Sequence, residues 1–451
     1  MSDKNHLSLL ACTLFFSVTQ VAAGPQVPTY SENQYQTIIG VNQVYMSPDG
    51  KDSGDCVRSK PCKTFNYAIA EMKPGDGLIL LPGFYSLKNN GALSAANAKG
   101  RPIPLSAQPL TGLSADKPTV IRAEEPGKVE IEGGFTLGTR SEKVKHIVIF
   151  GITFLSEGSL RNADFSVIKN TGIKGSLGIG TNDHSEGCMY NLVEDVWIWG
   201  RNHRGNAVNY RAHHNIWRRV LVRDDGCDQP FCGEGRGNYS IGTTIYNSHD
   251  VTFENVIVFD RIMGNNPHGY ADFATAQHES MREPQPEGEA NGRNQWLGCM
   301  SINSEDAAIN FEADETLDFP EKTGTIKDFV ALKSRHGLSV DGAHRPYKGN
   351  SYFEMDNLNL YTTQGGVFYV GCDIVNRKTD KGCAHQIGRI NKGQYKPNMS
   401  HVLPQLRYGS PQALWPWPNE LRIKNDLCKN DEYPRGFCQS DMSLTEYLKR
   451  F

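Results

Sequence analysis

Two stretches of the chain decide the fold: LVEDVWIWG at residues 192–200 and IWRRVLVRD at residues 216–224. In each, an apolar residue is followed after three intervening positions by two apolar residues separated by one. The pattern recurs at Val148/Ile152/Phe154, Leu192/Val196/Ile198, Ile216/Val220/Val222, Thr252/Val256/Val258, Trp296/Met300/Ile302 and Ile326/Val330/Leu332, and Leu358/Leu360 continue it. Such repetition is typical of a chain built from stacked strands.

The spacing of the repeats indicates a solenoid. Their middle members lie at positions 152, 196, 220, 256, 300, 330 and 358, which gives steps of 44, 24, 36, 44, 30 and 28. The short steps suit one turn of a β-solenoid, and the long ones suit a turn with an inserted loop or two turns. We expect half-buried strands with apolar residues inward and polar residues outward. The prediction is an all-β, right-handed parallel β-helix over residues 24–400. A β-sandwich or propeller is the alternative, and the scarcity of Asn-Gly hairpin signals disfavours it.

The N-terminal end of the solenoid carries a helical pattern. Phe65, Ala68, Ile69 and Met72 follow the i, i+3, i+4, i+7 spacing of an amphipathic helix, and the apolar run 78–81 predicts a buried strand after it. A solenoid needs a cover over its open end. Residues of about 44–85 are therefore expected to form an N-terminal cap.

The C-terminal residues 401–451 differ in composition from the repeats and predict a disulfide-stapled tail. Ser443 and Glu446 have the spacing of a capping box, so a short helix is expected at the end of the chain. Trp415 and Trp417 either stack on sugar rings or pack the tail against the last turn of the solenoid.

The first 23 residues predict export. Lys4 precedes the apolar run 7–21, and small residues at 21–23 supply a cleavage site. The mature protein is expected to be secreted or periplasmic, without a membrane span; Cys12 leaves a lipoprotein site as an alternative. The net charge of −3 and the absence of a basic stripe exclude a nucleic-acid partner, and we expect a monomer.

The ten cysteines after the signal peptide suggest local disulfides. The proposed pairs are Cys56 with Cys62, Cys227 with Cys232, Cys372 with Cys383, and Cys428 with Cys438, which leaves Cys188 to pair with Cys299. The alternative is that one or two cysteines remain free buried thiols.

A resemblance to a known family rests on the opening segments and the repeats. The segments VYMSPDG at 44–50 and KPCKTFNYAIAEMKPGDGLILLPGFY at 60–85, followed by the strand repeats, resemble the secreted pectate-lyase-like β-helix proteins over residues 44–372. The resemblance implies the fold. It leaves the reaction open, because this solenoid carries lyases, hydrolases, epimerases and structural proteins.

Three acids after the second strand resemble the calcium cluster of one pectate lyase family. Asp224, Asp225 and Asp228 have the spacing of that cluster and offer the hard oxygen ligands that Ca²⁺ prefers. The resemblance implies that calcium neutralises a uronate carboxylate and so makes β-elimination feasible. The alternative is a turn in which the aspartates accept hydrogen bonds from backbone amides.

The catalytic base of that family is a lysine in a Gly-aromatic-Lys context. Here HGYAD at 268–272 places Ala271 at the lysine position. His268 or Arg261 is then the candidate base, His268 because imidazole titrates near neutral pH. A surface histidine without a role is the alternative for His268.

A second resemblance is to β-helix polygalacturonases, which are inverting hydrolases. It rests on the Asp224–Asp225 pair and on His336-Gly337, although 111 residues separate Asp225 from His336. Arg335 and His336 are candidates for holding sugar carboxylates. Three functions stay open: a calcium-dependent lyase or epimerase acting on an acidic polysaccharide, which is favoured; a glycoside hydrolase; and a non-catalytic carbohydrate-binding or surface scaffold protein.

Overall fold

The computed structural model describes most of the coil and the end of the tail. The described residues are 26–93, 108–180, 188–201, 205–226, 240–246, 248–262, 269–277, 293–305, 307–313, 324–341, 353–356, 358–362, 390–391, 415–429, 431 and 434–451. The predicted signal peptide lies outside them.

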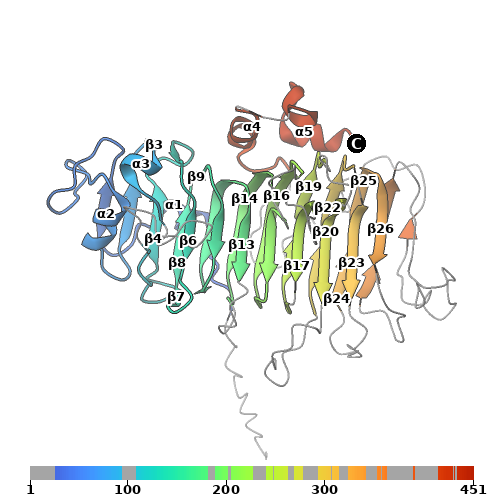
Figure 1. Cartoon of the computed structure of the whole chain (residues 1–451), viewed down its shortest axis with the longest axis horizontal. Coiled ribbons are helices and arrows are strands. Elements are labelled where there is room, and N and C mark those ends of the chain that lie inside the picture. Colours follow the sequence, from blue (N-terminus) through green and yellow to red (C-terminus); the bar gives the residue numbers. More distant parts are fainter. Residues whose placement is uncertain are drawn as a thin grey trace, which may run out of the picture.

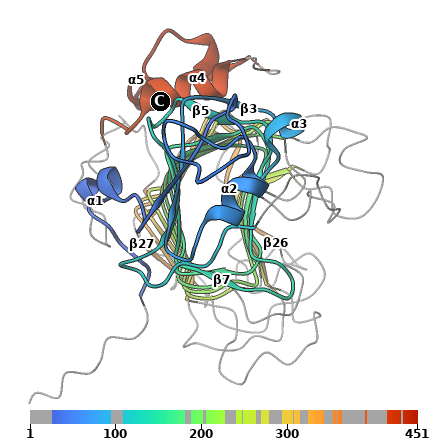
Figure 2. The ribbon, with the colours of Figure 1, turned by 90° about the vertical axis from the view of Figure 1, so that its left-hand side faces the viewer.

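The chain is a parallel β-helix with three ladders of strands (Figures 1 and 2), which confirms the predicted fold class. Every strand pair in these ladders is parallel, and each turn of the coil contributes a strand to one ladder after another. The sandwich and propeller alternatives are excluded, because both need antiparallel sheets. Among the described residues, no helix is long and apolar enough to cross a membrane.

Ladder 1 begins with the first strand of the chain. It consists of β1 (Gln43–Met46), β2 (Gly77–Leu80), β4 (Thr119–Ala123), β8 (Ile147–Phe150), the first halves of β12 (Val167–Lys174), β14 (Leu192–Gly200) and β16 (Ile216–Asp224), then β18 (Thr252–Glu254), β21 (Gln295–Leu297), β24 (Gly324–Lys327) and β27 (Phe353–Asp356).

Ladder 2 continues from ladder 1 through the long strands. It consists of β3 (Gly83–Tyr85), β5 (Val129–Ile131), β9 (Thr153–Phe154), the second halves of β12, β14 and β16, then β19 (Ile257–Phe259), β22 (Met300–Ile302), β25 (Val330–Ser334), β28 (Leu358–Thr362) and β29 (Ile390–Asn391).

Ladder 3 forms the separate sheet. It consists of β6 (Phe135–Leu137), β10 (Gly158–Leu160), β13 (Leu177–Gly180), β15 (Ala207–Tyr210), β17 (Ser240–Tyr246), β20 (Gly269–Gln277), β23 (Ala307–Ala313) and β26 (His336–Asp341). A short pair, β7 (Val144–Lys145) with β11 (Ala163–Asp164), lies between ladders 3 and 1.

A single left-handed residue makes the corner between ladders 1 and 2 on several of the described turns. Asn170, Asp195, Arg219, Asn255 and Asp328 occupy this position on different turns, each with φ near +50°. Asn and Asp tolerate this backbone conformation better than most residues. The repeated corner keeps successive turns in register, so the strands stack directly on one another.

Parts of the outer surface of the coil are buried as well as its interior. All nine residues of β14 and all nine of β16 are buried, although we expected polar residues to face outward. Trp197 and Leu221 point outward on ladder 2 and pack beneath the C-terminal tail, with Trp417 and Ile423. The alternation prediction was wrong here because other parts of the chain cover these faces.

Ladder 1 is covered by the N-terminal segment. Helix α1 (Glu32–Thr37) places Tyr35 against Phe150, with ring centroids 6.0 Å apart. Beside it, Lys169 on β12 contacts Glu32 at 2.8 Å and Asp195 at 2.7 Å in a buried ion-pair network. This outer face is therefore closed by packing and by paired charges.

The strand register corrects two details of the predicted repeat. Ile257 pairs with Met300, so Val256 lies one residue out of step with Met300. A slip of one residue exchanges the faces of a strand: Val256 belongs to the inner core and Met300 to the cluster beneath the tail. The step from 152 to 196 also holds an extra turn, through β12.

The two ends of the chain contain the helices. Helix α2 (Phe65–Glu71) buries Phe65, Ala68 and Ile69 at the N-terminal end of the coil, as predicted (Figure 2), and the short α3 (Leu87–Asn90) lies nearby. The tail contains α4 (Glu420–Cys428), a 3-10 turn (Gly436–Gln439) and α5 (Leu444–Lys449).

The tail folds back over the middle turns of ladder 2, rather than onto the last turn as expected (Figure 1). Its last helix begins with the predicted capping box: the Ser443 hydroxyl accepts from the Glu446 amide, and Glu446 accepts from the Ser443 amide. The apolar outer row of ladder 2 fixes this position, because the tail buries it.

Two of the proposed disulfides are present, Cys56–Cys62 and Cys428–Cys438. Cys188 and Cys299 are free, buried thiols, so the predicted pairing between them was wrong. Each thiol is enclosed in the interior of the coil on its own turn, and burial raises the pKa of Cys188 to about 11 and of Cys299 to about 12. The other four cysteines, Cys227, Cys232, Cys372 and Cys383, lie outside the described residues.

Candidate functional site

A groove of about 730 Å³ runs along the coil where ladder 2 meets the tail. Its floor comes from successive turns, because Lys174, Trp199 and Arg223 stand next to one another in the register of β12, β14 and β16. The lining residues are Phe84, Glu130, Thr153, Leu155, Ser156, Glu157, Lys174, Gly175, Trp199, Gly200, Arg201, Arg223, Asp225, Asp426, Leu427, Lys429 and Asp431.

Among the carboxyl groups that line this groove, Glu157 is the best candidate for a proton donor. It lies in the turn between β9 and β10, and burial raises its pKa, while a hydrogen bond from Ser176 opposes the rise. On the next turn, Gly175 has φ +101°, and a Cβ there would stand 3.0 Å from Glu157 Cγ. Close packing against this glycine therefore positions the Glu157 side chain.

The wall of the groove is the helix α4. Asp426 accepts from the Thr153 hydroxyl at 3.0 Å and from Trp197 Nε1 at 2.8 Å, and burial raises its pKa. Arg422 lies over the Trp197 ring, 4.6 Å from its centroid. These contacts hold α4 onto the coil, and Phe84, 49% exposed, offers an aromatic surface in the groove.

Asp224 and Asp225 belong to an arginine network. The fully buried Asp224 accepts from Arg261 Nε at 3.0 Å and from the Gly226 amide at 2.9 Å. Asp225 lines the groove and accepts from both Arg223 Nε and Nη2, at 3.0 and 3.1 Å, and from Arg435 at 2.8 Å. The tail residue Arg435 thus completes a site that begins on the coil.

A calcium ion does not fit these two carboxylates as they stand. Each is already neutralised by guanidinium groups, and the Gly226 amide takes up the other oxygen of Asp224. A cation there would have to displace ion pairs that are buried. Asp228, the third acid of the predicted cluster, lies outside the described residues.

Arg261, one of the two candidate bases, belongs to the same buried network as Asp224. Arg261 is buried inside the coil between Asp224 and Asp272, whose oxygens lie 3.0 and 3.7 Å from its Nε. A paired guanidinium keeps its proton, so this geometry does not suit a base. His268 lies outside the described residues. Its neighbour Ala271 is buried on β20.

The candidate sugar-binding residues lie at the far end of the coil. Arg335 stands between β25 and β26, and its amide donates to the Ser304 carbonyl at 3.0 Å. His336 begins β26 and pairs in register with Ala307. Arg335 does not line the groove. Of the predicted site residues whose side chains the structure describes, Asp225 lines the groove, whereas Asp224, Arg261 and Arg335 do not.

Sequence reasoning missed Glu157. The turn that carries it, LSEGS at 155–159, has no motif spacing, and its significance comes from Gly175 on the next turn. One feature of the sequence pointed to this turn. Phe154 ends a predicted strand repeat, so the residues after it, including Glu157, are expected in the turn that follows the strand.

Comparisons with known proteins give fold-level likeness. No model of a known protein family and no curated protein matches the chain. Among solved structures, the GH136 lacto-N-biosidase from Eubacterium ramulus is 11% identical with a TM-score of 0.44; the alignment covers 71% of this chain and 64% of that protein. Pectate lyase Pel9A is 12% identical over 74% of this chain and 83% of its own, with a TM-score of 0.38. A rhamnogalacturonan lyase is 14% identical over 72% and 69%, with a TM-score of 0.33. At these values the likeness assigns no activity.

Proposed function

We propose that the protein binds a polysaccharide along the groove and cleaves a glycosidic bond there, with Glu157 as the proton donor. The observation that carries the proposal is the raised pKa of Glu157 in an open groove that crosses several turns of the coil. A carboxyl group that keeps its proton can protonate the leaving sugar oxygen.

The groove offers other groups that suit a sugar chain. Phe84 provides an exposed apolar ring, and Lys174 and Arg201 place cations in the same groove as Glu157, which suits an acidic polysaccharide. Asp225 lies three turns from Glu157, and three strand spacings amount to about 14 Å. This exceeds the separation of roughly 6.5–9.5 Å in an inverting pair, so Asp225 is assigned to binding.

The test compares Glu157→Gln with wild type on a panel of acidic and neutral polysaccharides. The isosteric amide cannot donate the carboxyl proton, so we expect kcat to fall by about 10²–10⁴ while binding persists. In wild type, kcat should decline at high pH with an apparent pKa above that of an ordinary glutamate. Glu125→Gln, an exposed acid outside the groove, is the control and should keep full kcat.

The products distinguish the reaction classes. New reducing ends alone indicate hydrolysis, whereas an additional ultraviolet absorbance indicates elimination, and calcium dependence would support the aspartate cluster with Asp228. A Glu157→Gln enzyme with unchanged kcat contradicts the proposal. Retention of a polysaccharide without products on the whole panel would favour a binding protein.

A further inference from the structure

A column of side chains runs along the corner that precedes ladder 1. Each member has a left-handed backbone with φ between +50° and +57° and follows the previous one on the next turn; they are His146, Phe165, Tyr190, His214, Asp250 and Arg293. The first four are stacked rings, ending with Tyr190 and His214 at 4.8 Å between centroids. After His214 the column changes from aromatic to charged.

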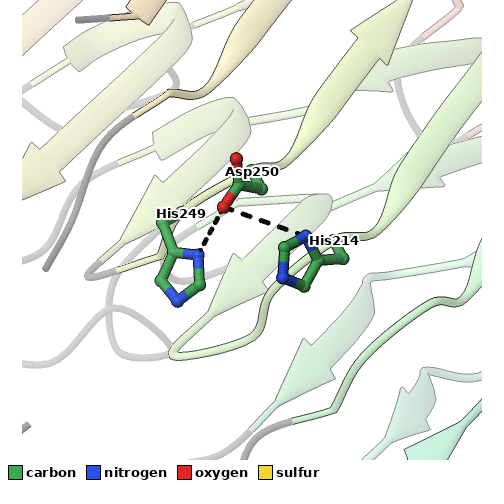
Figure 3. A group of neighbouring side chains, drawn as sticks. All are labelled: His214, His249 and Asp250. Atoms are coloured by element: carbon green, nitrogen blue, oxygen red, sulfur yellow. Dashed lines mark hydrogen bonds and ion pairs between the residues drawn. The ribbon is translucent and has the colours of Figure 1, made fainter. Parts of the chain in front are cut away.

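Three potential metal ligands meet at this change. His249 Nδ1 lies 2.8 Å from Asp250 Oδ2, and His214 Nδ1 lies 3.8 Å from the same oxygen (Figure 3). The ligand atoms of all three residues lie within 4.8 Å of one another. A tetrahedral zinc ion with bonds of about 2.0–2.1 Å would space its ligands by roughly 3.3 Å, so small rotations would bring these groups into place.

The two histidines approach the carboxylate from different directions. Their rings are nearly perpendicular, at 85°, with centroids 5.4 Å apart. His213 stacks on His249 at 3.8 Å and fixes the orientation of its ring.

His249 can present a lone pair to a metal. In the structure its Nδ1 faces Asp250, while its buried Nε2 has no hydrogen-bond partner among the described residues. The ring proton can therefore move from Nδ1 to Nε2 without breaking another hydrogen bond. In this tautomer the Nδ1 lone pair is available to a metal ion.

The site is open to solvent on one side. A cavity of about 490 Å³ is lined by His214, Asp250, Tyr190 and Arg293, together with residues of the N-terminal segment and of strands in ladder 1. An ion can enter through it, and water can complete the coordination. Three protein ligands with one open position resemble the arrangement of catalytic rather than structural zinc sites.

Arg293 would compete with a metal ion for the Asp250 carboxylate. Its Nε donates to Asp250 Oδ1 at 2.7 Å, and its Nη2 donates to Asp250 Oδ2. The Arg293 guanidinium therefore already lies beside the carboxylate that a metal ion would bind.

We propose that His214, His249 and Asp250 form a binding site for a divalent transition-metal ion of the Zn²⁺ type, which Arg293 occupies in the absence of metal. Two imidazoles and a carboxylate favour zinc and its neighbours over Ca²⁺ or Mg²⁺. The site is separate from the groove, since neither histidine nor Asp250 lines it.

The test uses protein without a histidine tag, treated with EDTA, desalted and titrated with Co²⁺. We expect one equivalent to bind, with the visible absorption bands of a tetrahedral site, and Zn²⁺ to abolish them. His214→Ala should weaken binding at least tenfold. His146→Ala removes a histidine of the same column that does not belong to the cluster of His214, His249 and Asp250, and it should bind as wild type does.

The variant Arg293→Ala distinguishes a metal site from an ion pair that is purely structural. Loss of the competing cation should tighten Co²⁺ binding several-fold, whereas a purely structural role predicts no binding at all. Circular dichroism confirms that each variant is folded. The proposal is overturned if neither wild type nor Arg293→Ala binds Co²⁺, or if His214→Ala binds as well as His146→Ala.

Discussion

At the scale of single residues, glycine positions the proposed acid. Gly175 has a backbone conformation that other residues rarely adopt, and its hydrogen atoms face Glu157. Gly175→Ala should lower stability by about 1–3 kcal/mol through backbone strain and displace Glu157, lowering kcat. Chemical denaturation and kinetics measure the two effects.

Gly178 provides the matched control, because nothing lies within 4 Å of a Cβ built there and its φ is ordinary. Gly178→Ala should change stability by less than about 0.5 kcal/mol. Equal effects of the two substitutions would show that the contact between Gly175 and Glu157 is unimportant.

A second residue, Asp272, should make stability depend on pH. Burial raises its pKa from 3.8 to about 7, while Arg261 and hydrogen bonds from Ser301 and Ser304 oppose the rise. Arg261 is shared with Asp224, so one guanidinium faces two buried carboxyls and neutralises one of them. Asp272 is then protonated in the folded protein at acidic pH.

The sign of the effect follows from proton binding. Between pH 4 and 7 the folded protein holds a proton that the unfolded chain has lost, so this contribution to stability is complete below pH 4 and lost as pH rises to 7. The slope is at most about 1.4 kcal/mol per pH unit. Asp272→Asn should flatten it in urea titrations at several pH values; an unchanged slope would exclude Asp272 as the source.

At the scale of elements, the tail depends on one carboxylate of the coil. Asp260 accepts from the Tyr447 hydroxyl at 2.6 Å and from the Phe437 amide at 2.8 Å, and Arg435 donates to its carbonyl at 2.8 Å. These contacts link α5 and the 3-10 turn to the corner after ladder 2.

Asp260→Ala should release the tail. Loss of these charge-assisted hydrogen bonds should cost about 2–4 kcal/mol of local stability, and limited proteolysis should then cut within residues 415–451. Asp328→Ala is the control, because Asp328 has the same left-handed conformation at another corner. Equal cleavage in both variants would point to general loss of stability.

At the scale of the whole molecule, the covered middle turns should be the most stable part. Strands β14 and β16 are buried along their entire length, beneath the N-terminal segment and the tail, whereas β10 in ladder 3 alternates buried and half-buried residues. Opening the middle turns requires removing both covers.

Hydrogen exchange followed by mass spectrometry tests this order. Amides of Leu192–Gly200 and Ile216–Asp224 should exchange more slowly than those of Gly158–Leu160. Equal protection of ladder 3 would show instead that the coil opens as one unit.

The sequence by itself determined the coil, the capping helix α2 and the capping box of α5. These follow from short-range patterns: repeated strands, the spacing of Phe65 to Met72, and the pair Ser443 and Glu446. The disulfides Cys56–Cys62 and Cys428–Cys438 could also be predicted from the sequence, because each closes a short loop whose ends lie close together.

Tertiary structure alone decided which residues meet across turns. Loops of different length separate the turns, so a spacing along the chain cannot reveal that Gly175 faces Glu157 or that His214 meets Asp250. The same reason explains why Cys188 and Cys299 remain apart. The packing of the tail onto ladder 2 created the groove, and no local pattern of the sequence indicates it.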